Sequence, residues 1–290
     1  MSASLVSAQG DRGSGLEARL SRVEGAVYLH VSGQPDDQFV EAQEGEELAQ
    51  GDLVKTGEDG RAEITLEGPS VIDVSPNTDF TLDSLAPQDT VFGLSLGSFI
   101  AKIKKLADSQ QMHFATPTAV AAVRGTELSV EAGADGRPAH VGVFDEGHVA
   151  VTAPGVAGQT ELGPGQESEI RAGAAPGQPR PLSALLAGRS RLAAVRQRQQ
   201  YWRSHWRARP AAQRRAMRQA LMRRRFIRRE QLQRRGPAIR RRAQFLQQRR
   251  QRRPQARGQG SGGPRPGQRQ GAAARRRLRR QRHPAAGEPK

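Results

Sequence analysis

The chain reads His140-Val-Gly-Val-Phe144, then Asp145-Glu-Gly147, then His148-Val-Ala-Val-Thr152. Apolar side chains alternate with polar or small ones in both runs, which is typical of a strand with one buried face. The Asp-Glu-Gly step between the runs is a turn signal. This stretch therefore predicts two strands joined at hairpin spacing.

Similar runs occur on the N-terminal side of this stretch, at Val23–Val31, Ala62–Leu66, Val71–Val74 and Thr126–Val130. Gly, Pro, Asp and Asn separate the runs about every ten residues. Such spacing predicts an all-β domain, either an antiparallel sandwich or a rolled, solenoid-like sheet. One window, Ser98–Ala107, predicts a helix with Phe99 and Ile103 on one face, and a strand through residues 93–103 is the competing interpretation.

The net charge of +17 on 290 residues conceals two different regions. Residues 1–180 hold 12 basic and 27 acidic side chains, whereas residues 181–290 hold 34 basic and 2 acidic ones. The chain has no cysteine, which excludes a disulfide framework, a zinc ribbon and a thiol nucleophile. It also has no apolar run of about 18 residues, so the sequence predicts no membrane-spanning helix.

Composition divides the chain into segments: a disordered start (1–20), the β domain (21–171), a Pro/Gly linker (172–182), Arg-rich helices (183–253) and a disordered basic tail (254–290). Val6-Ser-Ala8 before Gln9 matches the small-residue pattern of a signal-peptide cleavage site, but too few residues precede it to form the apolar segment. Either a signal peptide precedes Met1 or the start is simply disordered. The first reading predicts a periplasmic or secreted protein, and the second a cytoplasmic one.

The Arg-rich segment changes to a helical period. Ser183 is predicted to cap a helix over 184–209, Pro210 to begin a second over 211–235, and Pro237 to open a third over 238–253. Met217, Leu221 and Phe226 with Ile227 form a rough apolar stripe, and the two tryptophans stand four residues apart.

Guanidinium groups among aromatic rings are suited to an anionic polymer or membrane interface. The candidate polyanion-binding residues are Trp202, Arg203, Trp206, Arg207, Arg214, Arg215, Arg218, Arg223, Arg224, Arg225, Arg228 and Arg229. Two other interpretations need no external partner. The tryptophans could pack the first tail helix onto the β domain, and the whole tail could fold back onto that acidic domain.

No catalytic, cofactor-binding or metal-binding residue emerges from the sequence. No pair of histidines has the His-Glu-x-x-His spacing of a helical zinc site. His140 and His148 could form a two-ligand metal site across the predicted hairpin, against a solvated strand face as the plainer interpretation. The sequence therefore predicts a protein that is not an enzyme and takes no small-molecule substrate.

The order Gly51–Thr56, Phe114–Thr126, Glu146–Val151 and Leu162–Gln166 resembles the FecR-type extracytoplasmic domain over about residues 21–171. The signature that carries the resemblance best comprises Thr116, Pro117, Val123, Arg124, Gly125 and Thr126. The resemblance implies an all-β module of a bacterial envelope protein. In the family's namesakes such domains relay a signal from an outer-membrane receptor to a cytoplasmic sigma factor.

The sequence departs from those sigma regulators, whose cytoplasmic segment and transmembrane helix precede the domain, and it carries an arginine-rich tail in place of their receptor-binding module. The signature itself predicts structure: Pro117 marks a strand edge, and Gly125 permits positive φ. Arg124 is expected to pair with a carboxylate, the alternative being an anionic ligand.

Three functions follow from these observations. The favoured hypothesis is an envelope binding or scaffold protein, whose β domain contacts a protein or glycan. Its tail would contact anionic envelope material such as lipopolysaccharide phosphate, anionic lipid or extracellular nucleic acid. The alternatives are a cytoplasmic nonspecific nucleic-acid-binding protein and a FecR-like regulator of a receptor and sigma-factor system.

Overall fold

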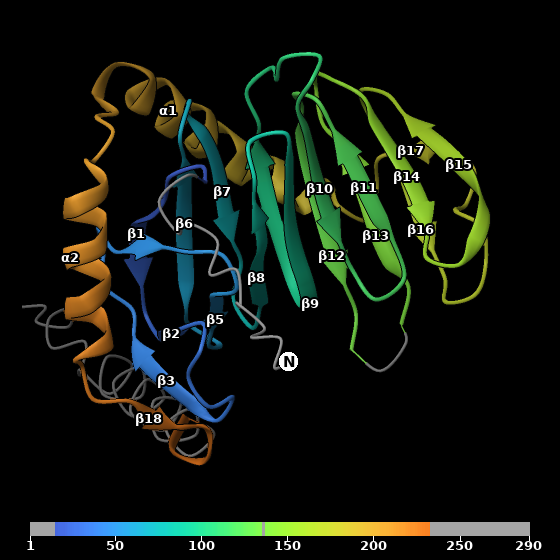
Figure 1. Cartoon of the computed structure of the whole chain (residues 1–290). Coiled ribbons are helices and arrows are strands. Elements are labelled where there is room, and N and C mark those ends of the chain that lie inside the picture. Colours follow the sequence, from blue (N-terminus) through green and yellow to red (C-terminus); the bar gives the residue numbers. More distant parts are fainter. Residues whose placement is uncertain (1–14, 135–136, 233–290) are drawn as a thin grey trace, which may run out of the picture. The chain divides into compact units, whose positions relative to one another are not determined.

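The computed structural model describes residues 15–134 and 137–232, which form two β-sheets with two helices against them (Figure 1). Sheet A contains, in spatial order, β4 (Glu47–Leu48), β1 (Ala18–Glu24), β6 (Arg61–Leu66), β7 (Ser70–Val74), the end of β9 (Asp89–Lys102), β12 (Glu127–Ala132), β13 (Ala139–Val143), β16 (Gln166–Ile170) and β17 (Arg180–Pro181).

Sheet B contains β3 (Gln38–Glu41), β2 (Val27–His30), β5 (Leu53–Thr56), β8 (Asp79–Leu85), the start of β9, β10 (Gln111–Ala115), β11 (Val120–Val123), β14 (Val149–Ala153) and β15 (Val156–Leu162). β9 and β10 run parallel, while the strands on either side of them pair antiparallel. The expected all-β domain with helices after it is confirmed, as two sheets whose strands pair antiparallel apart from β9 and β10.

Strand β9 belongs to both sheets. Its first part pairs with β8 and β10 in sheet B, and its last part, from Gly97, pairs with β7 and β12 in sheet A. Gly97 has φ +93°, and a Cβ there would lie 2.6 Å from the Cα of Thr78, so the change of sheet requires glycine. The helix predicted over 98–107 is therefore wrong, and the competing strand is correct. Phe99 faces the core while Ile100 is buried on the outer face, and apolar residues on both faces imitate a helical pattern.

The stretch around Asp145 is also not a hairpin. β13 pairs in sheet A and β14 in sheet B, so the Asp-Glu-Gly turn carries the chain from one sheet to the other. The run Val23–Val31 is divided in the same way at Gly25, which has φ +63°. Alternation correctly identified these strands, but it does not specify which strand is the partner. By contrast, β6 and β7 do form a hairpin, in which Ile64 lies opposite Ile72.

Four phenylalanines join the two sheets at the centre of the core. Phe99 of the sheet A part of β9 lies 4.7 Å from Phe114 and 5.5 Å from Phe80, measured between ring centroids. Phe92 stacks on both of the latter rings. All four side chains are fully buried, and each such ring contributes a large apolar area to the core.

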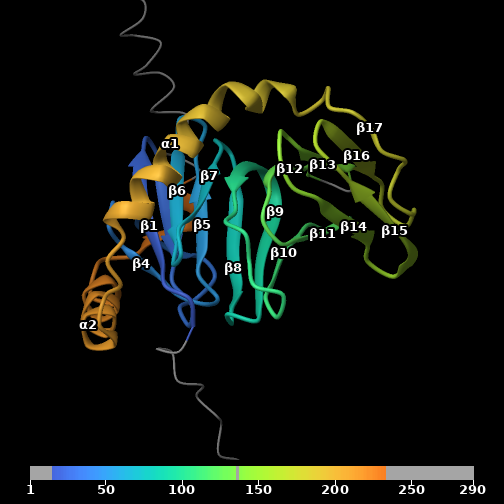
Figure 2. The same cartoon turned by 90° about the horizontal axis from the view of Figure 1, so that it is seen from above.

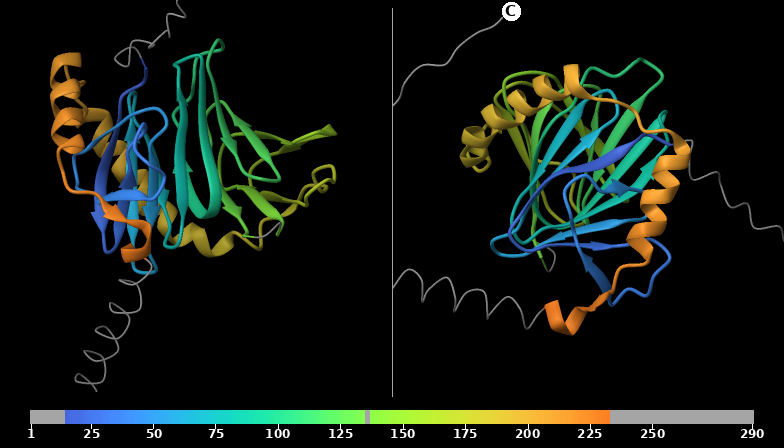
Figure 3. Two further views of the ribbon diagram at one scale, coloured as in Figure 1. Left: turned by 60° about the horizontal axis from the view of Figure 1, so that its bottom comes forward. Right: turned by 90° about the vertical axis from the view of Figure 1, so that its left-hand side faces the viewer.

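The arm, defined as residues 183–232, contains η1 (Leu186–Gly188), α1 (Arg189–His205), α2 (Ala211–Met222) and β18 (Ile227–Arg228). α1 crosses sheet A (Figure 2), and α2 stands at one end of the sandwich (Figure 3). Within the described residues, no helix is both long and apolar enough to cross a membrane.

Three predicted helix limits need correction, since α1 also ends at His205 and not at Arg209. α1 begins at Arg189 rather than Ala184, because the Ser183 hydroxyl binds Glu167 instead of capping a helix. α2 ends at Met222 rather than near residue 235, because the chain then pairs as β18 with β3. The third predicted helix, over 238–253, lies outside the described residues.

Candidate binding surfaces beneath the arginine arm

The outer face of sheet A carries carboxylates at positions that would face solvent if nothing covered the sheet. Glu63 lies opposite Asp73, which lies opposite Ile100, so the three form one outward row across β6, β7 and β9. Glu127 of β12 points outward in the neighbouring row. These carboxylates are nevertheless buried, because α1 covers them. We call this surface, under α1, the sheet A face.

Arginines of α1 bind the carboxylates of the sheet A face. Arg191 Nη1 lies 3.1 Å from Asp73 Oδ2. Arg196 forms a two-pronged contact with Glu127, in which Nε donates to Oε1 at 2.6 Å. Such forked pairs are the stronger form of charged hydrogen bond. The arm therefore meets the β domain with matched charges.

An apolar contact accompanies these ion pairs. Leu192 and Val195 of α1 pack on Val71, Ile100 and Phe144, and all of these side chains are at most 2% exposed. Each aliphatic side chain buried in this way contributes about 1.5–3 kcal/mol. α1 is thus held by an apolar contact as well as by charge.

The two tryptophans lie against the β domain. Trp202 packs on the same apolar cluster as α1, and the Trp206 ring lies 4.1 Å from the guanidinium carbon of Arg19 in β1. Both indole Nε1 atoms are buried without a hydrogen-bond partner in the described structure. Both rings are partly buried, and Trp202 also contacts the exposed ring of Tyr201, with centroids 5.1 Å apart.

One buried carboxylate, that of Glu167 in β16, holds the first residues of the arm. Its oxygens accept hydrogen bonds from the backbone N–H groups of Ser183, Ala184 and Leu185 at 3.0–3.2 Å, and from Arg180 Nε at 3.1 Å. Burial by itself would raise the pKa of Glu167, but these donors outweigh it and lower that pKa below its ordinary value. Glu167 therefore fixes the direction in which the arm leaves the sandwich.

α2 lies beside a second acidic surface, which we call the Asp52 edge and define as Glu17, Glu46, Glu47 and Asp52. Asp52 is fully buried, and its two oxygens accept hydrogen bonds from the backbone N–H groups of Ser32 and Ala49, both at 2.9 Å. Arg218 completes the site with a fork, in which Nη2 donates to Asp52 Oδ1 at 2.6 Å.

The other carboxylates of this edge also face arginines of the arm. Glu47 lies 3.3 Å from Arg209 Nη1 and 3.7 Å from Arg214 Nη1. Glu46 pairs with Arg224. The backbone N–H of Arg209 donates to Glu17 at 3.0 Å. Four arginines thus meet four carboxylates at one end of the sandwich.

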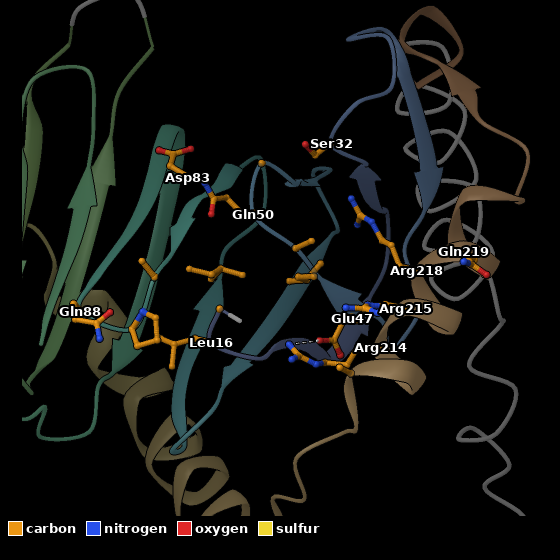
Figure 4. Close-up of a pocket in the computed structure, with 18 residues that line it drawn as sticks. Leu16, Ser32, Glu47, Gln50, Asp83, Gln88, Arg214, Arg215, Arg218 and Gln219 are labelled. Carbon is orange, nitrogen blue, oxygen red and sulfur yellow. Dashed lines mark ion pairs between the residues drawn. The ribbon is translucent and has the colours of Figure 1, made fainter. Parts of the chain in front are cut away.

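A cavity of about 1010 Å³ separates part of α2 from the sandwich (Figure 4). Its apolar lining includes Leu16, Leu48, Leu85 and Pro87. α2 contributes Ala211, Arg214, Arg215, Arg218 and Gln219. The helix therefore covers this end of the sandwich without filling it.

Burial raises the pKa of several carboxylates at both surfaces. It raises the pKa of Glu47 to about 7, with the nearby Glu17 adding to the effect. Burial likewise raises the pKa of Glu46 at the Asp52 edge, and of Glu63 and Asp73 at the sheet A face. A raised pKa marks a carboxylate that is costly to keep ionised. Burial also acts to raise the pKa of Glu127, but hydrogen bonds from Arg196 and Lys102 outweigh it and lower that pKa, so the forked pair under α1 favours the ionised form.

The predicted polyanion-binding residues fall into two groups. Arg214, Arg218 and Arg224 are half-buried and pair with carboxylates of the same chain. The exposed group comprises Arg203, Arg207, Arg215, Arg223, Arg225, Arg228 and Arg229. The carboxylates that receive the arm were not predicted from the sequence. One feature of the sequence could have indicated them. They occupy outward positions on strands that also carry apolar residues on the outward face, which indicates that something covers that face.

The family signature occupies structural positions. In the turn around Pro117, the Thr116 hydroxyl accepts a hydrogen bond from the backbone N–H of Ala119 at 2.8 Å. The Thr126 hydroxyl donates a hydrogen bond to the Glu146 backbone carbonyl at 2.8 Å. Gly125 has the predicted positive φ, +131°, and a Cβ there would lie 2.6 Å from the Lys105 Cα.

The remaining members of the signature differ in exposure. Val123 is buried in the core. Arg124 is exposed and forms no ion pair with a described residue, so the expected carboxylate partner is not found. The signature therefore supports the fold and supplies no reactive group.

The structure does not bring His140 and His148 together, so the less favoured of the two interpretations, a metal site across a hairpin, is wrong. The first lies in β13 of sheet A and the second precedes β14 of sheet B, so they do not face each other across a hairpin. Among the described residues, no group of three or more histidine or acidic side chains is arranged to hold a metal ion.

Residues 52–150 match the FecR protein family. The resemblance inferred from the sequence is thus confirmed over this FecR segment, which begins at Asp52 and runs through the central strands of both sheets. No curated protein sequence matches the chain.

Two crystal structures, both described as a "putative anti-sigma factor" from Parabacteroides distasonis, show a similar arrangement at 15% sequence identity. One has a TM-score of 0.42, with 48% of this chain and 63% of that chain covered. The other has a TM-score of 0.40, with 46% and 61% covered. The chain spans less than two thirds of the length of either structure.

Proposed function

We propose that this chain is a regulatory binding protein of the FecR type, which acts by contacting another protein and not by catalysis. The observation that supports the proposal is the FecR match over residues 52–150. This segment contains Asp52, Glu63, Asp73 and Glu127, four of the carboxylates that bind arginines of the arm. A protein surface that already binds a helix through matched charges is suited to exchange of protein partners.

Deletion of the gene in its own host tests the regulatory role. We expect a set of transcripts with a common promoter element to change, and the full chain to restore them. Sigma-factor regulation predicts such a set, whereas a purely structural role predicts none. An unchanged transcript profile, under conditions in which the protein is present, would contradict the proposal.

We further propose that the protein works outside the cytoplasm. The support is the FecR resemblance together with the cleavage-like Val6-Ser-Ala8 pattern before Gln9. Mass spectrometry of the protein from its host should find an N-terminus at Gln9 in the envelope or periplasmic fraction. An intact Met1 in the cytoplasmic fraction would overturn this part.

A second candidate function is an envelope scaffold whose arm contacts anionic material. The exposed arginines of the arm favour it, and Arg203, Arg207, Arg223 and Arg225 are among them. Replacing these four by glutamine should reduce sedimentation with phosphatidylglycerol vesicles but leave the low background with phosphatidylcholine unchanged. Equal binding of duplex DNA, weakening steeply with salt, would favour the nucleic-acid alternative instead.

A further inference from the structure

Two acceptors of the Asp52 edge, Asp52 and Glu46, are fixed independently of the arm. Backbone N–H groups of Ser32 and Ala49 hold both oxygens of Asp52. Glu46 accepts a hydrogen bond from the Gln43 backbone N–H at 2.9 Å. Because turns of the sandwich itself position these carboxylates, they are ready to receive guanidinium groups from any correctly spaced helix.

α2 uses only part of this surface. Leu16, Leu48 and Leu85 line the cavity of about 1010 Å³ that remains beside it. The residues that α2 turns toward this cavity include Ala211, which is short, and Arg215, which is charged. Both residues are exposed, so the cavity opens to solvent beside α2, and a larger apolar side chain at either position would remove apolar surface of the lining from water.

The contacts that attach α2 to the sandwich are ones that another helix could replace. Its buried apolar anchor is Leu221, assisted by the partly buried Phe226 beyond the helix. The helix also contacts the sandwich through ion pairs, of which that between Arg218 and Asp52 is the most buried, and through a hydrogen bond from Gln34 to the Met222 sulfur. Ion pairs at a partly solvated edge contribute little net free energy and weaken in salt.

We infer that the Asp52 edge and its cavity form a docking site for an arginine-bearing amphipathic helix of a partner protein, and that α2 occupies this site within the same chain as a competitor. The partner helix carries two arginines four residues apart, as Arg214 and Arg218 are in α2. It also carries large apolar side chains where α2 has Ala211 and Arg215. The inference rests on the proposed function and names the class of partner.

Fluorescence anisotropy with the full chain tests this site. The probe is a labelled synthetic peptide of residues 207–226 carrying Ala211→Leu and Arg215→Leu. The opened chain carries Arg214→Gln, Arg218→Gln and Arg224→Gln. We expect the opened chain to bind the probe at least about tenfold more tightly than the unaltered chain does, because its own α2 no longer competes. The same peptide without the two leucines should bind the opened chain more weakly.

A matched control chain carries Arg203→Gln, Arg223→Gln and Arg225→Gln. It has the same charge change at exposed positions and should bind the probe like the unaltered chain. Circular dichroism and thermal unfolding of each variant confirm that the sandwich is intact.

Three results would overturn the inference. The first is equal affinity of the probe for the opened and unaltered chains. The second is undiminished binding when Asp52→Asn, which removes the charge that receives the arginine fork, is added to the opened chain. The third is exchange of arms between two opened copies, seen as a dimer that excludes the probe. Loss of probe binding with an intact transcript effect would remove this docking site but leave the regulatory proposal standing.

Discussion

α1 and α2 present arginines to carboxylates of the same domain, yet the two helices are held differently. α1 buries Leu192 and Val195 on an apolar patch of sheet A, and its ion pairs surround that patch. α2 has Leu221 as its buried side chain and lies beside a large cavity. Charge complementarity thus selects where each helix lies, whereas apolar burial determines how firmly it stays.

The largest expected effect is at α1. Leu192→Ala removes a side chain that is 1% exposed, so the free energy of unfolding of the arm should fall by about 2–4 kcal/mol. Hydrogen exchange of the α1 amides measures the loss. Ala193→Ser, on the exposed side of the same helix, is the control. If α1 exchange were unaffected by loss of Leu192, its apolar contact would not be what holds it.

Glu167 is expected to come next. Glu167→Gln keeps the shape but weakens the acceptor for three backbone N–H groups, at a cost of about 2 kcal/mol. Thermal unfolding should show the decrease, and α1 and α2 should both become more accessible to protease. Glu161→Gln, at an exposed position of β15, should be neutral. Protease resistance equal to that of the unaltered chain would show that the start of the arm needs no charge.

Arg218→Gln should release α2 and leave α1 in place. Loss of the fork on Asp52 is expected to cost about 1–2 kcal/mol, seen as faster amide exchange in α2 alone. Arg223→Gln, with an exposed side chain, provides the comparison. Equal acceleration in both helices would mean that they open as one unit, against the distinction drawn between them.

The pH dependence of α2 follows from Glu47. Burial, together with the nearby Glu17, raises its pKa to about 7, although Arg209, Arg214 and Arg19 act in the opposite direction. Between the ordinary pKa of 4.5 and about 7, the docked form holds a proton that the released form does not. Docking of α2 should therefore weaken as the pH rises through this window, by on the order of tenfold in its opening equilibrium.

Amide exchange of α2, corrected for the intrinsic pH dependence of exchange, measures this effect. Glu47→Gln cannot ionise, so it should show a much smaller change over the same pH range. A strengthening of α2 docking with rising pH would contradict the assignment. Glu46 carries a raised pKa of the same sign and is the variant to test second.

The smallest effect is expected at Arg124, within the family signature. Its side chain is exposed and lies outside both acidic surfaces, so Arg124→Gln should change stability by less than about 0.5 kcal/mol. By contrast, Gly125→Ala should be clearly destabilising, because φ is +131° and the added Cβ would meet the Lys105 backbone. Thermal unfolding of the two variants compares the adjacent positions directly.

Alternation and turn residues were sufficient to predict several strands, among them β6, β7, β12, β13 and β14, but not β9, for which a helix was expected, and not which sheet each strand joins. The two runs flanking Asp145 show the reason: a turn that closes a hairpin and a turn that crosses between sheets have the same local composition. The partner of a strand is decided by contacts that are distant in sequence, such as that of Phe99 with Phe114.

The candidate surfaces could be predicted only in part from the sequence. The charge of the two regions indicated that they could meet, but the positions at which they meet depend on the register of β6, β7, β9 and β12. That register places Glu63 and Asp73 in one row, and no local pattern reports it. The sequence likewise could not decide whether Trp202 and Trp206 face a membrane or polyanion or pack on the β domain, because that also depends on contacts distant in sequence.

The order in which the chain is synthesised gives the arm a further consequence. The last strand of sheet A is β17, which ends at Pro181, whereas Arg218 lies 37 residues later (218 − 181). At ordinary rates of translation, the Asp52 edge therefore stands open for several seconds before its own helix exists. A partner helix present during that interval meets no competitor, so the occupant of the site can be decided while the protein is still being made.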